Sequence, residues 1–116
     1  MKKYVAIYTG SPAGRAKWEA MDEKKRKEQE KAGMDAWGKW VAAKGQSIVD
    51  MGTPLGKTKR ISDQGISGTV NQIVAYTIVQ AESHEAAAQL FEKHPHFTIF
   101  PGDSVEVMEC LPIPGM

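Results

Sequence analysis

The sequence has little of what several classes of protein require. Among its 116 residues there is one cysteine, Cys110, so it can form neither a disulfide within the chain nor a cysteine-based metal cluster. Its 15 basic and 14 acidic residues leave a formal net charge of +1, which gives no strong field to attract nucleic acid. Its 11 glycines are scattered, without the spacing of a phosphate-binding loop. We therefore expect no nucleic-acid partner and no nucleotide or metal cofactor.

The sequence also lacks a long hydrophobic run. The apolar stretch YVAIY near its start is too short for a signal peptide and far short of the roughly 20 residues of a membrane span. A lone cysteine suits a reducing compartment, and we expect Cys110 to pack as a small buried residue. These features predict a cytoplasmic protein with no membrane partner, and the length fits one domain comprising residues 1–116.

What the sequence does contain is short segments rich in β-branched and aromatic residues. They predict strands at residues 3–9, 47–52, 57–62, 71–81, 97–100 and 104–111. The segment 57–62 (KTKRIS) is the most polar, which is typical of an edge strand or a hairpin arm. In the segment 71–81 apolar residues occupy both alternating sets of positions, so both faces of this strand should be covered. Val105, Val107 and Leu111 are expected on one face of the last strand, opposite Glu106 and Met108.

Three other segments predict helices. Residues 15–31 are mostly charged, which indicates a solvated helix, and Gly33 is expected to break or bend it before a second helix at 34–44. In that second helix Met34, Trp37 and Val41 form an apolar face, and Gly45 is placed for a left-handed C-cap.

The third predicted helix comprises residues 84–94 (HEAAAQLFEKH). Ser83 is a favourable N-cap, and Ala87, Leu90 and Phe91 form the buried stripe. The strongest elements then follow the order β-α-β-β-α-β, which predicts a ferredoxin-like antiparallel α+β sheet with the helices on one face. A second copy of the chain is the simplest cover for the other, apolar face, so the sequence predicts a homodimer in which two sheets enclose a cavity.

Four stretches carry a resemblance to a known family. They are YVAIYTG, WGKWVAAKGQSIVDMGTPLG, VAYTIVQAESHEAAAQLFEKHPHF and SVEVMECLPIPGM. Together, and in this order, they resemble the YCII-related family, including its DGPF-type branch of small bacterial proteins. The resemblance implies a dimeric α+β barrel, similar in fold to muconolactone isomerase-like and antibiotic-biosynthesis monooxygenase-like proteins.

What the resemblance implies about activity is limited by departures from the family pattern. The branch that bears the family's name has a His and Asp pair, with the His on the first helical stretch. Here no histidine precedes His84, although Asp50 is able to occupy the acidic position. The Asp-Gly-Pro-Phe signature is absent too, and DQGISG stands in roughly that region.

The pair His94 and His96, on either side of Pro95, has two interpretations. Because a residue before proline avoids helical geometry, His94 is expected to end the helix, with its ring near the last carbonyls. Alternatively, one imidazole serves as an acid or base at the mouth of the barrel. Glu106 is a candidate for an enclosed carboxylate, or for one that pairs with a cation or faces water.

These residues define the expected site and two functions. The catalytic candidates are Glu106, His94 and Asp50, and the ligand-binding candidates are Tyr8, Tyr76, Trp37 and His96. The first function is binding, and isomerase- or lyase-type acid–base conversion, of a small organic molecule in the inter-sheet cavity. The second is a non-catalytic dimeric binding or interaction module, which a cavity packed shut by Met108 and aromatic rings would favour. The sequence does not decide whether the protein is an enzyme.

Overall fold

The computed structural model of the protein describes residues 1–115, and its main feature is an antiparallel sheet. It has four antiparallel strands, which are β1 (Lys2–Thr9), β2 (Ile48–Asp50), β5 (Ile73–Ala81) and β6 (Ser104–Glu109). Their order across the sheet is β2-β5-β1-β6, so the first strand along the sequence lies in the centre and the last at an edge. This order confirms the ferredoxin-like antiparallel sheet predicted from the sequence.

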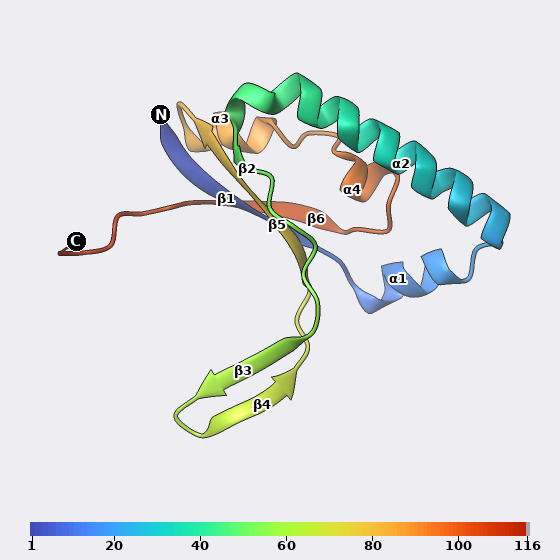
Figure 1. Ribbon diagram of the computed structural model, residues 1–116, viewed down its shortest axis with the longest axis horizontal. Helices are drawn as coiled ribbons and strands as arrows, with labels where there is room; N and C mark the ends of the chain where they lie inside the picture. Colours follow the sequence, from blue (N-terminus) through green and yellow to red (C-terminus); the bar gives the residue numbers. More distant parts are fainter. Residues whose placement is uncertain (116) are drawn as a thin grey trace.

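Helices lie along one face of this sheet (Figure 1). They are α2 (Glu23–Lys44), α3 (His84–Gln89) and α4 (Pro95–Thr98), with a short 3-10 turn at Gly45–Ser47, while α1 (Pro12–Glu19) lies beyond the end of β1. Successive side chains of β1 point to opposite faces of the sheet, as in any strand. Tyr4, Ala6 and Tyr8 point toward the helices and are buried. The rings of Trp37, Trp40 and Phe91 pack against them and form the core.

The opposite face of the sheet is also apolar. Val5 and Ile7 of β1 point to this face, and Met108 of β6 lies directly opposite Val5 in the register. Met108 is 46% exposed and Val74 of β5 is 38% exposed. The prediction that β5 carries apolar side chains on both faces is therefore confirmed. Within residues 1–115 the helices cover one of those faces, and we call the other, which carries Val5, Ile7 and Met108, the bare face of the sheet.

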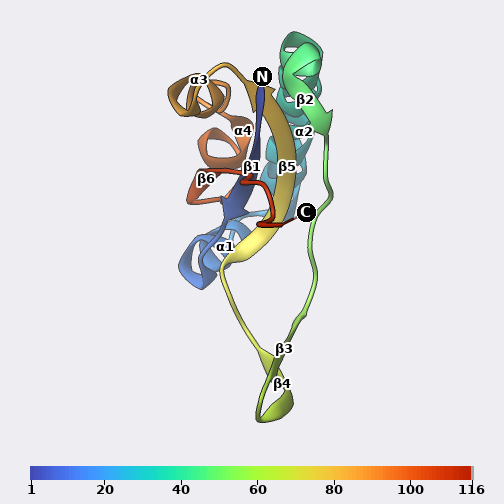
Figure 2. The same ribbon diagram turned by 90° about the vertical axis from the view of Figure 1, so that its left-hand side faces the viewer.

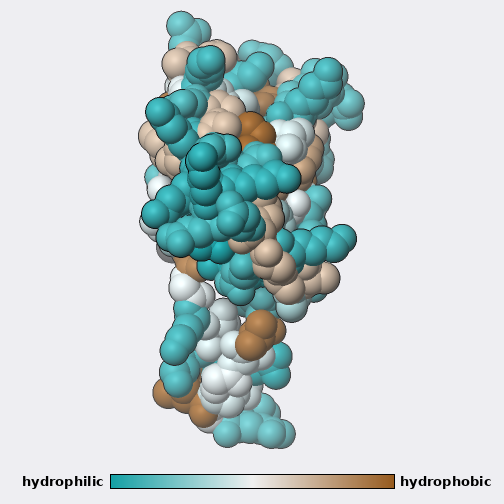
Figure 3. Space-filling model, turned by 90° about the vertical axis from the view of Figure 1, so that its right-hand side faces the viewer, coloured by the Kyte–Doolittle hydropathy of each residue, from teal (hydrophilic) through white to brown (hydrophobic). Residues whose placement is uncertain are grey.

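A separate hairpin projects from the sheet (Figure 1, Figure 2). It consists of β3 (Thr58–Ser62) and β4 (Gly65–Thr69), which pair with each other and with no other described strand. The hairpin arm expected at residues 57–62 is thus confirmed. Ile61 and Ile66 face each other across it and are 72% and 74% exposed. Figure 3 shows hydrophobic patches on this part of the molecule, below a body whose visible side is largely hydrophilic.

The helix boundaries near the start differ from the prediction. The break falls at residues 20–22, where Asp22 accepts a hydrogen bond from the Lys25 amide and begins α2. Gly33 lies inside α2, and it is buried because the Phe100 ring packs directly against its Cα. Gly45 has a right-handed helical conformation, with φ of −50°, so the expected left-handed C-cap is wrong.

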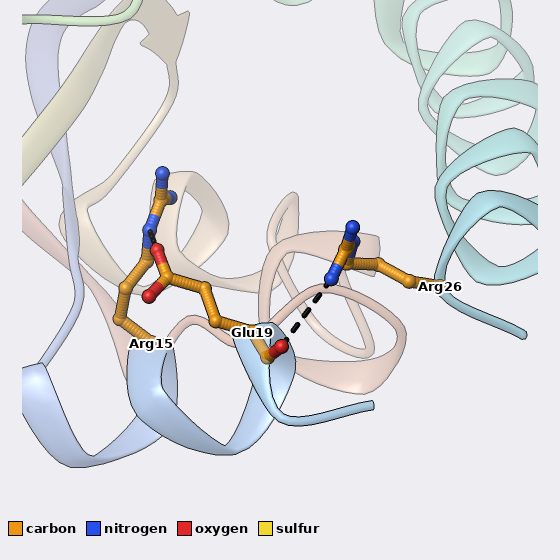
Figure 4. A network of polar contacts seen from close by, with 3 residues as sticks. All are labelled: Arg15, Glu19 and Arg26. Atoms are coloured by element: carbon orange, nitrogen blue, oxygen red, sulfur yellow. Dashed lines mark hydrogen bonds and ion pairs between the residues drawn. The ribbon is translucent and has the colours of Figure 1, made fainter. Parts of the chain in front are cut away.

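The corner between α1 and α2 is held by charged side chains (Figure 4). Arg15 pairs with Glu19 one helical turn away, with 3.1 Å between Nε and Oε1. Arg26 of α2 donates a hydrogen bond to the Glu19 carbonyl at 3.3 Å. Both pairs are exposed, so they orient the corner and add little to stability.

The C-terminal quarter contains the largest departure from the prediction. Residues 97–100 are not a strand, because Pro95 begins the one-turn helix α4 and backbone bonds of Phe97 and Thr98 to the His94 carbonyl close it. The preceding helix, predicted to reach residue 94, ends at Gln89 as α3. Leu111 lies beyond β6 and is exposed, so it does not share the buried side of Val105 and Val107. Cys110 is exposed rather than buried.

No helix within residues 1–115 is both long enough and apolar enough to cross a membrane.

Candidate functional site

A groove of about 950 Å³ lies where β1 ends, beside the segment that leaves β2 and the loop that follows α4. Its lining is largely apolar, which is typical of sites for small organic molecules. Of the residues proposed from the sequence to bind a ligand, all four line it: Tyr8, Trp37, Tyr76 and His96. The structure thus brings together side chains that are 88 positions apart along the chain.

Tyr8 stands in the inner wall of the groove and its hydroxyl is engaged. The Tyr8 Oη atom lies 2.9 Å from Thr77 Oγ1, and Thr77 donates its own proton to the Met51 carbonyl at 3.0 Å. Because Thr77 has a single hydroxyl proton, Tyr8 is the donor in their shared bond. Burial raises the pKa of Tyr8, so its hydroxyl keeps its proton at physiological pH.

His96 is 7% exposed and is held at its Nε2 atom. This atom lies 2.7 Å from the Thr9 carbonyl oxygen at the end of β1. The same edge of the ring lies against Gly102, where any side chain would collide with it. Burial lowers the pKa of His96, while the Thr9 bond and the charge of Asp103 act to raise it.

His94 is fully buried and acts at a helix terminus, though not the one that the sequence suggested. It has extended geometry before Pro95, as predicted, but its ring forms no hydrogen bond with the last carbonyls of α3. Instead its Nδ1 accepts a hydrogen bond of 3.0 Å from the His96 amide, which makes it the N-cap of α4. The capping bond fixes the backbone that carries His96.

Aromatic rings enclose the rest of the His94 imidazole. Trp37 and Trp40 lie 4.5 Å and 4.6 Å from it, nearly perpendicular to its plane, and Tyr8 and Phe91 complete the enclosure. Its Nε2 is the one buried side-chain nitrogen or oxygen among residues 1–115 that has no hydrogen-bond partner. Burial, with the neighbouring His96 as a smaller cause, lowers the pKa of His94 to about 4. The imidazole is therefore neutral at physiological pH.

The three catalytic candidates from the sequence do not meet within one chain. Glu106 lies opposite Ile7 on the bare face of the sheet, so it is on the other side from His94. Asp50 is exposed at the end of β2, where its Oδ1 accepts a hydrogen bond of 2.8 Å from the Gly52 amide. Tyr76 is also on the bare side of β5, and it reaches the groove because the segment around Gly52 packs on its backbone.

Several residues that shape the groove were missed at the sequence level. Thr77 was not among the candidates, although a polar residue on a buried, otherwise apolar face is the signal that marks it. Thr9 acts through its backbone carbonyl, which no side-chain pattern reveals. Gly102 was not singled out either, and it leaves room for the His96 ring.

A second, smaller hollow of about 380 Å³ lies between α3 and β6. His84 lines it and is exposed, with Nε2 2.7 Å from the Val107 carbonyl and its ring stacked on Tyr4. Within residues 1–115, no three side chains of His, Cys, Asp or Glu gather in a way that would hold a metal ion.

Comparisons with known proteins bear on the fold. No model of a known protein family matches the sequence. No curated protein matches it either. Among solved structures, the chain is similar to 5-chloro-2-hydroxyhydroquinone dehydrochlorinase from Burkholderia phenoliruptrix AC1100, in its complex with 2,5-dihydroxybenzoquinone. The TM-score is 0.52 and the identity 14%, over 91% of this chain and 90% of that chain. At this identity the likeness shows a shared α+β fold, and it carries no function by itself.

Proposed function

We propose that the protein is a homodimer of the YCII-related type that binds a small organic molecule in the groove and converts it by acid–base chemistry. The observation that carries this proposal is the placement of Tyr8 and His96 in one largely apolar groove. Both side chains are almost fully buried, and each is fixed by a hydrogen bond to the protein. A pre-oriented pair of titratable groups in a concave apolar site is what general acid–base catalysis uses.

Isomerase- or lyase-type chemistry is the class that suits this site. The solved structure of similar fold is named a dehydrochlorinase, which is an elimination activity, and it holds a small hydroxylated ring compound. We carry that reaction class to this chain as part of the proposal. Glu106 remains proposed as a carboxylate enclosed between the sheets of the dimer, and Asp50 as an acidic group at the rim of the groove.

The dimer is proposed from the bare face of the sheet. Val5, Ile7 and Met108 lie together there, and apolar surface left in water costs about 25 cal/mol per Å². A second copy presents the same apolar surface, so two sheets packed face to face would cover each other by a twofold axis.

Ligand binding is tested by a screen of small aromatic and enolic compounds with protein-observed NMR. We expect binding compounds to shift the backbone amides of Met51, Gly52 and Phe100, which surround the groove, because a bound ring alters their surroundings. Amides around the smaller hollow, such as those of Ala88 and Glu92, serve as the control and should stay in place. A screen in which compounds bind elsewhere, or in which none binds, contradicts the proposed function.

The hairpin gives the second function, a non-catalytic interaction module, its own support. An isolated two-stranded hairpin is only marginally stable in water, and this one exposes the apolar pair Ile61 and Ile66. Such an arm suits contact with another protein surface. Failure of the ligand screen, together with loss of the dimer in a variant carrying Ile61→Ser and Ile66→Ser, would favour this second function and an interface on the hairpin in place of the bare face.

A further inference from the structure

The hydrogen bonds around the groove determine where its protons lie. A backbone carbonyl can only accept a hydrogen bond, so the bond of 2.7 Å to Thr9 requires that His96 Nε2 carries a proton. In the neutral imidazole the other ring nitrogen then has none. His96 therefore has a free lone pair at Nδ1.

This Nδ1 atom remains open to a ligand. No described residue forms a hydrogen bond with it, yet it is not among the buried unpaired atoms, of which His94 Nε2 is the single case in residues 1–115. The opposite edge of the ring is closed by Gly102 and Thr9. The small exposed part of His96 therefore includes the Nδ1 side of the ring, and His96 lines the groove.

Tyr8 is also able only to accept a hydrogen bond from a ligand. Its only hydroxyl proton is used in the bond to Thr77, which passes its own proton to the Met51 carbonyl. Tyr8 can thus offer lone pairs to the groove but no donor. The two buried polar side chains of the groove wall are both acceptors, so a well-bound ligand has to supply the donors, because an unmatched buried polar group costs about 1–3 kcal/mol.

We propose that His96 Nδ1 selects ligands that carry an acidic hydroxyl group, a phenol or an enol, and accepts a hydrogen bond from it. The flat body of such a compound lies against Trp37 and Phe100, which line the same groove. This inference rests on the proposed function, because it uses the same groove. Burial favours the neutral form of His96, and the facing groups are His94, which is neutral, and Asp103.

The first test reads the protons of His96 directly. Long-range ¹H–¹⁵N NMR of the imidazoles at neutral pH should show His96 protonated at Nε2 and bare at Nδ1. Hydroquinone is the probe, and 1,4-dimethoxybenzene is its matched control, since methylation removes the donors while keeping the ring. We expect hydroquinone to move the His96 Nδ1 resonance toward that of a hydrogen-bonded nitrogen and to bind at least about tenfold more tightly than its ether.

Two matched variants complete the test. His96→Gln keeps a donor near the position of Nε2 and removes the acceptor at Nδ1, so it should abolish the preference for hydroquinone over the ether. His84→Gln is the control, because His84 Nε2 is also hydrogen-bonded to a backbone carbonyl, but His84 lines the smaller hollow and not the groove. It should bind both compounds as the unaltered protein does.

The outcomes separate this inference from the proposed function. A proton on Nδ1, equal binding of hydroquinone and its ether in the groove, or no groove binding of hydroquinone overturns the role of His96 as selector of hydroxyl donors. Binding of other compounds in the groove would leave the proposed function standing in all three cases. Loss of the preference in His96→Gln, with His84→Gln unchanged, supports the inference.

Discussion

At the scale of single residues, His94 shows how one side chain can serve structure while a neighbour serves the site. The sequence predicted that His94 ends a helix before Pro95. Its extended geometry is confirmed, because it follows from local sterics, but the preceding helix ends at Gln89 and His94 begins α4 instead. Which helix it caps, and that four aromatic rings enclose it, depends on residues from β1, α2 and the turn that follows α3. Contacts between such distant segments have no local pattern from which to predict them.

The buried His94 predicts a specific pH dependence of stability. Its pKa of about 4 in the folded chain is below the value near 6.5 of an exposed histidine, so the unfolded chain binds more protons between these pH values. Stability is therefore lost as the pH falls through this window, by up to about 3 kcal/mol. Urea unfolding between pH 4 and 7 measures this loss.

The matched variant for this measurement is His94→Asn. Asparagine is a favourable N-cap and does not titrate, so the capping bond to the His96 amide is kept and the pH dependence should become shallower. His94→Ala removes both the cap and the titration, and it should be less stable than His94→Asn at pH 7. An unchanged slope with pH in His94→Asn would show that His94 is not the responsible group.

At the scale of elements, α2 shows why a glycine in a helix is ambiguous. The sequence suggested a break or a bend at Gly33 because glycine is a poor helix former. The structure instead uses Gly33 to let Phe100 approach the helix, a reason that depends on a residue 67 positions away. The segment 97–100 was predicted to be a strand, and this too was wrong because a neighbouring feature decides its structure. Its β-branched and aromatic residues suit a strand, but Pro95 and the His94 cap start a helix first.

Two glycines of α2 predict opposite effects of the same change. Gly33→Ala places a methyl group into the Phe100 ring, and we expect a loss of about 1–3 kcal/mol in unfolding free energy. The methyl group added by Gly38→Ala has no neighbouring atom within 4 Å. This variant should gain up to about 1 kcal/mol in unfolding free energy, because alanine favours a helix. Thermal and urea unfolding of the two variants provides the comparison, and equal effects would contradict the packing described for Gly33.

At the scale of the whole molecule, the sheet and its bare face were predictable from the sequence. The alternation of apolar residues in β5 shows that both of its faces are apolar, because the side-chain period of a strand is local. The order of strands and helices along the chain then predicts the topology of the sheet. The groove was not predicted at its actual place. The sequence suggested a cavity between the sheets of two copies, whereas the groove lies at one end of the sheet within a single chain.

The proposed dimer predicts the effect of a charge on the bare face. Met108→Lys places a cation among apolar neighbours, so the dimer should dissociate, while the conservative change Met108→Leu should keep it. Sedimentation velocity at micromolar concentration measures both variants and the unaltered chain. If the unaltered chain sediments as a monomer, the proposed dimer is wrong.

The exposed Cys110, at the end of β6, makes the chain convenient for spectroscopy. It is the only thiol in the sequence, so a maleimide or nitroxide reagent modifies each copy once, without any engineered residue. Its backbone is tied to the central strand by the hydrogen bond from its amide to the Lys3 carbonyl, so an attached label would share the rigidity of the sheet. In a twofold assembly the labels would give a single inter-probe separation, and a monomer would give none.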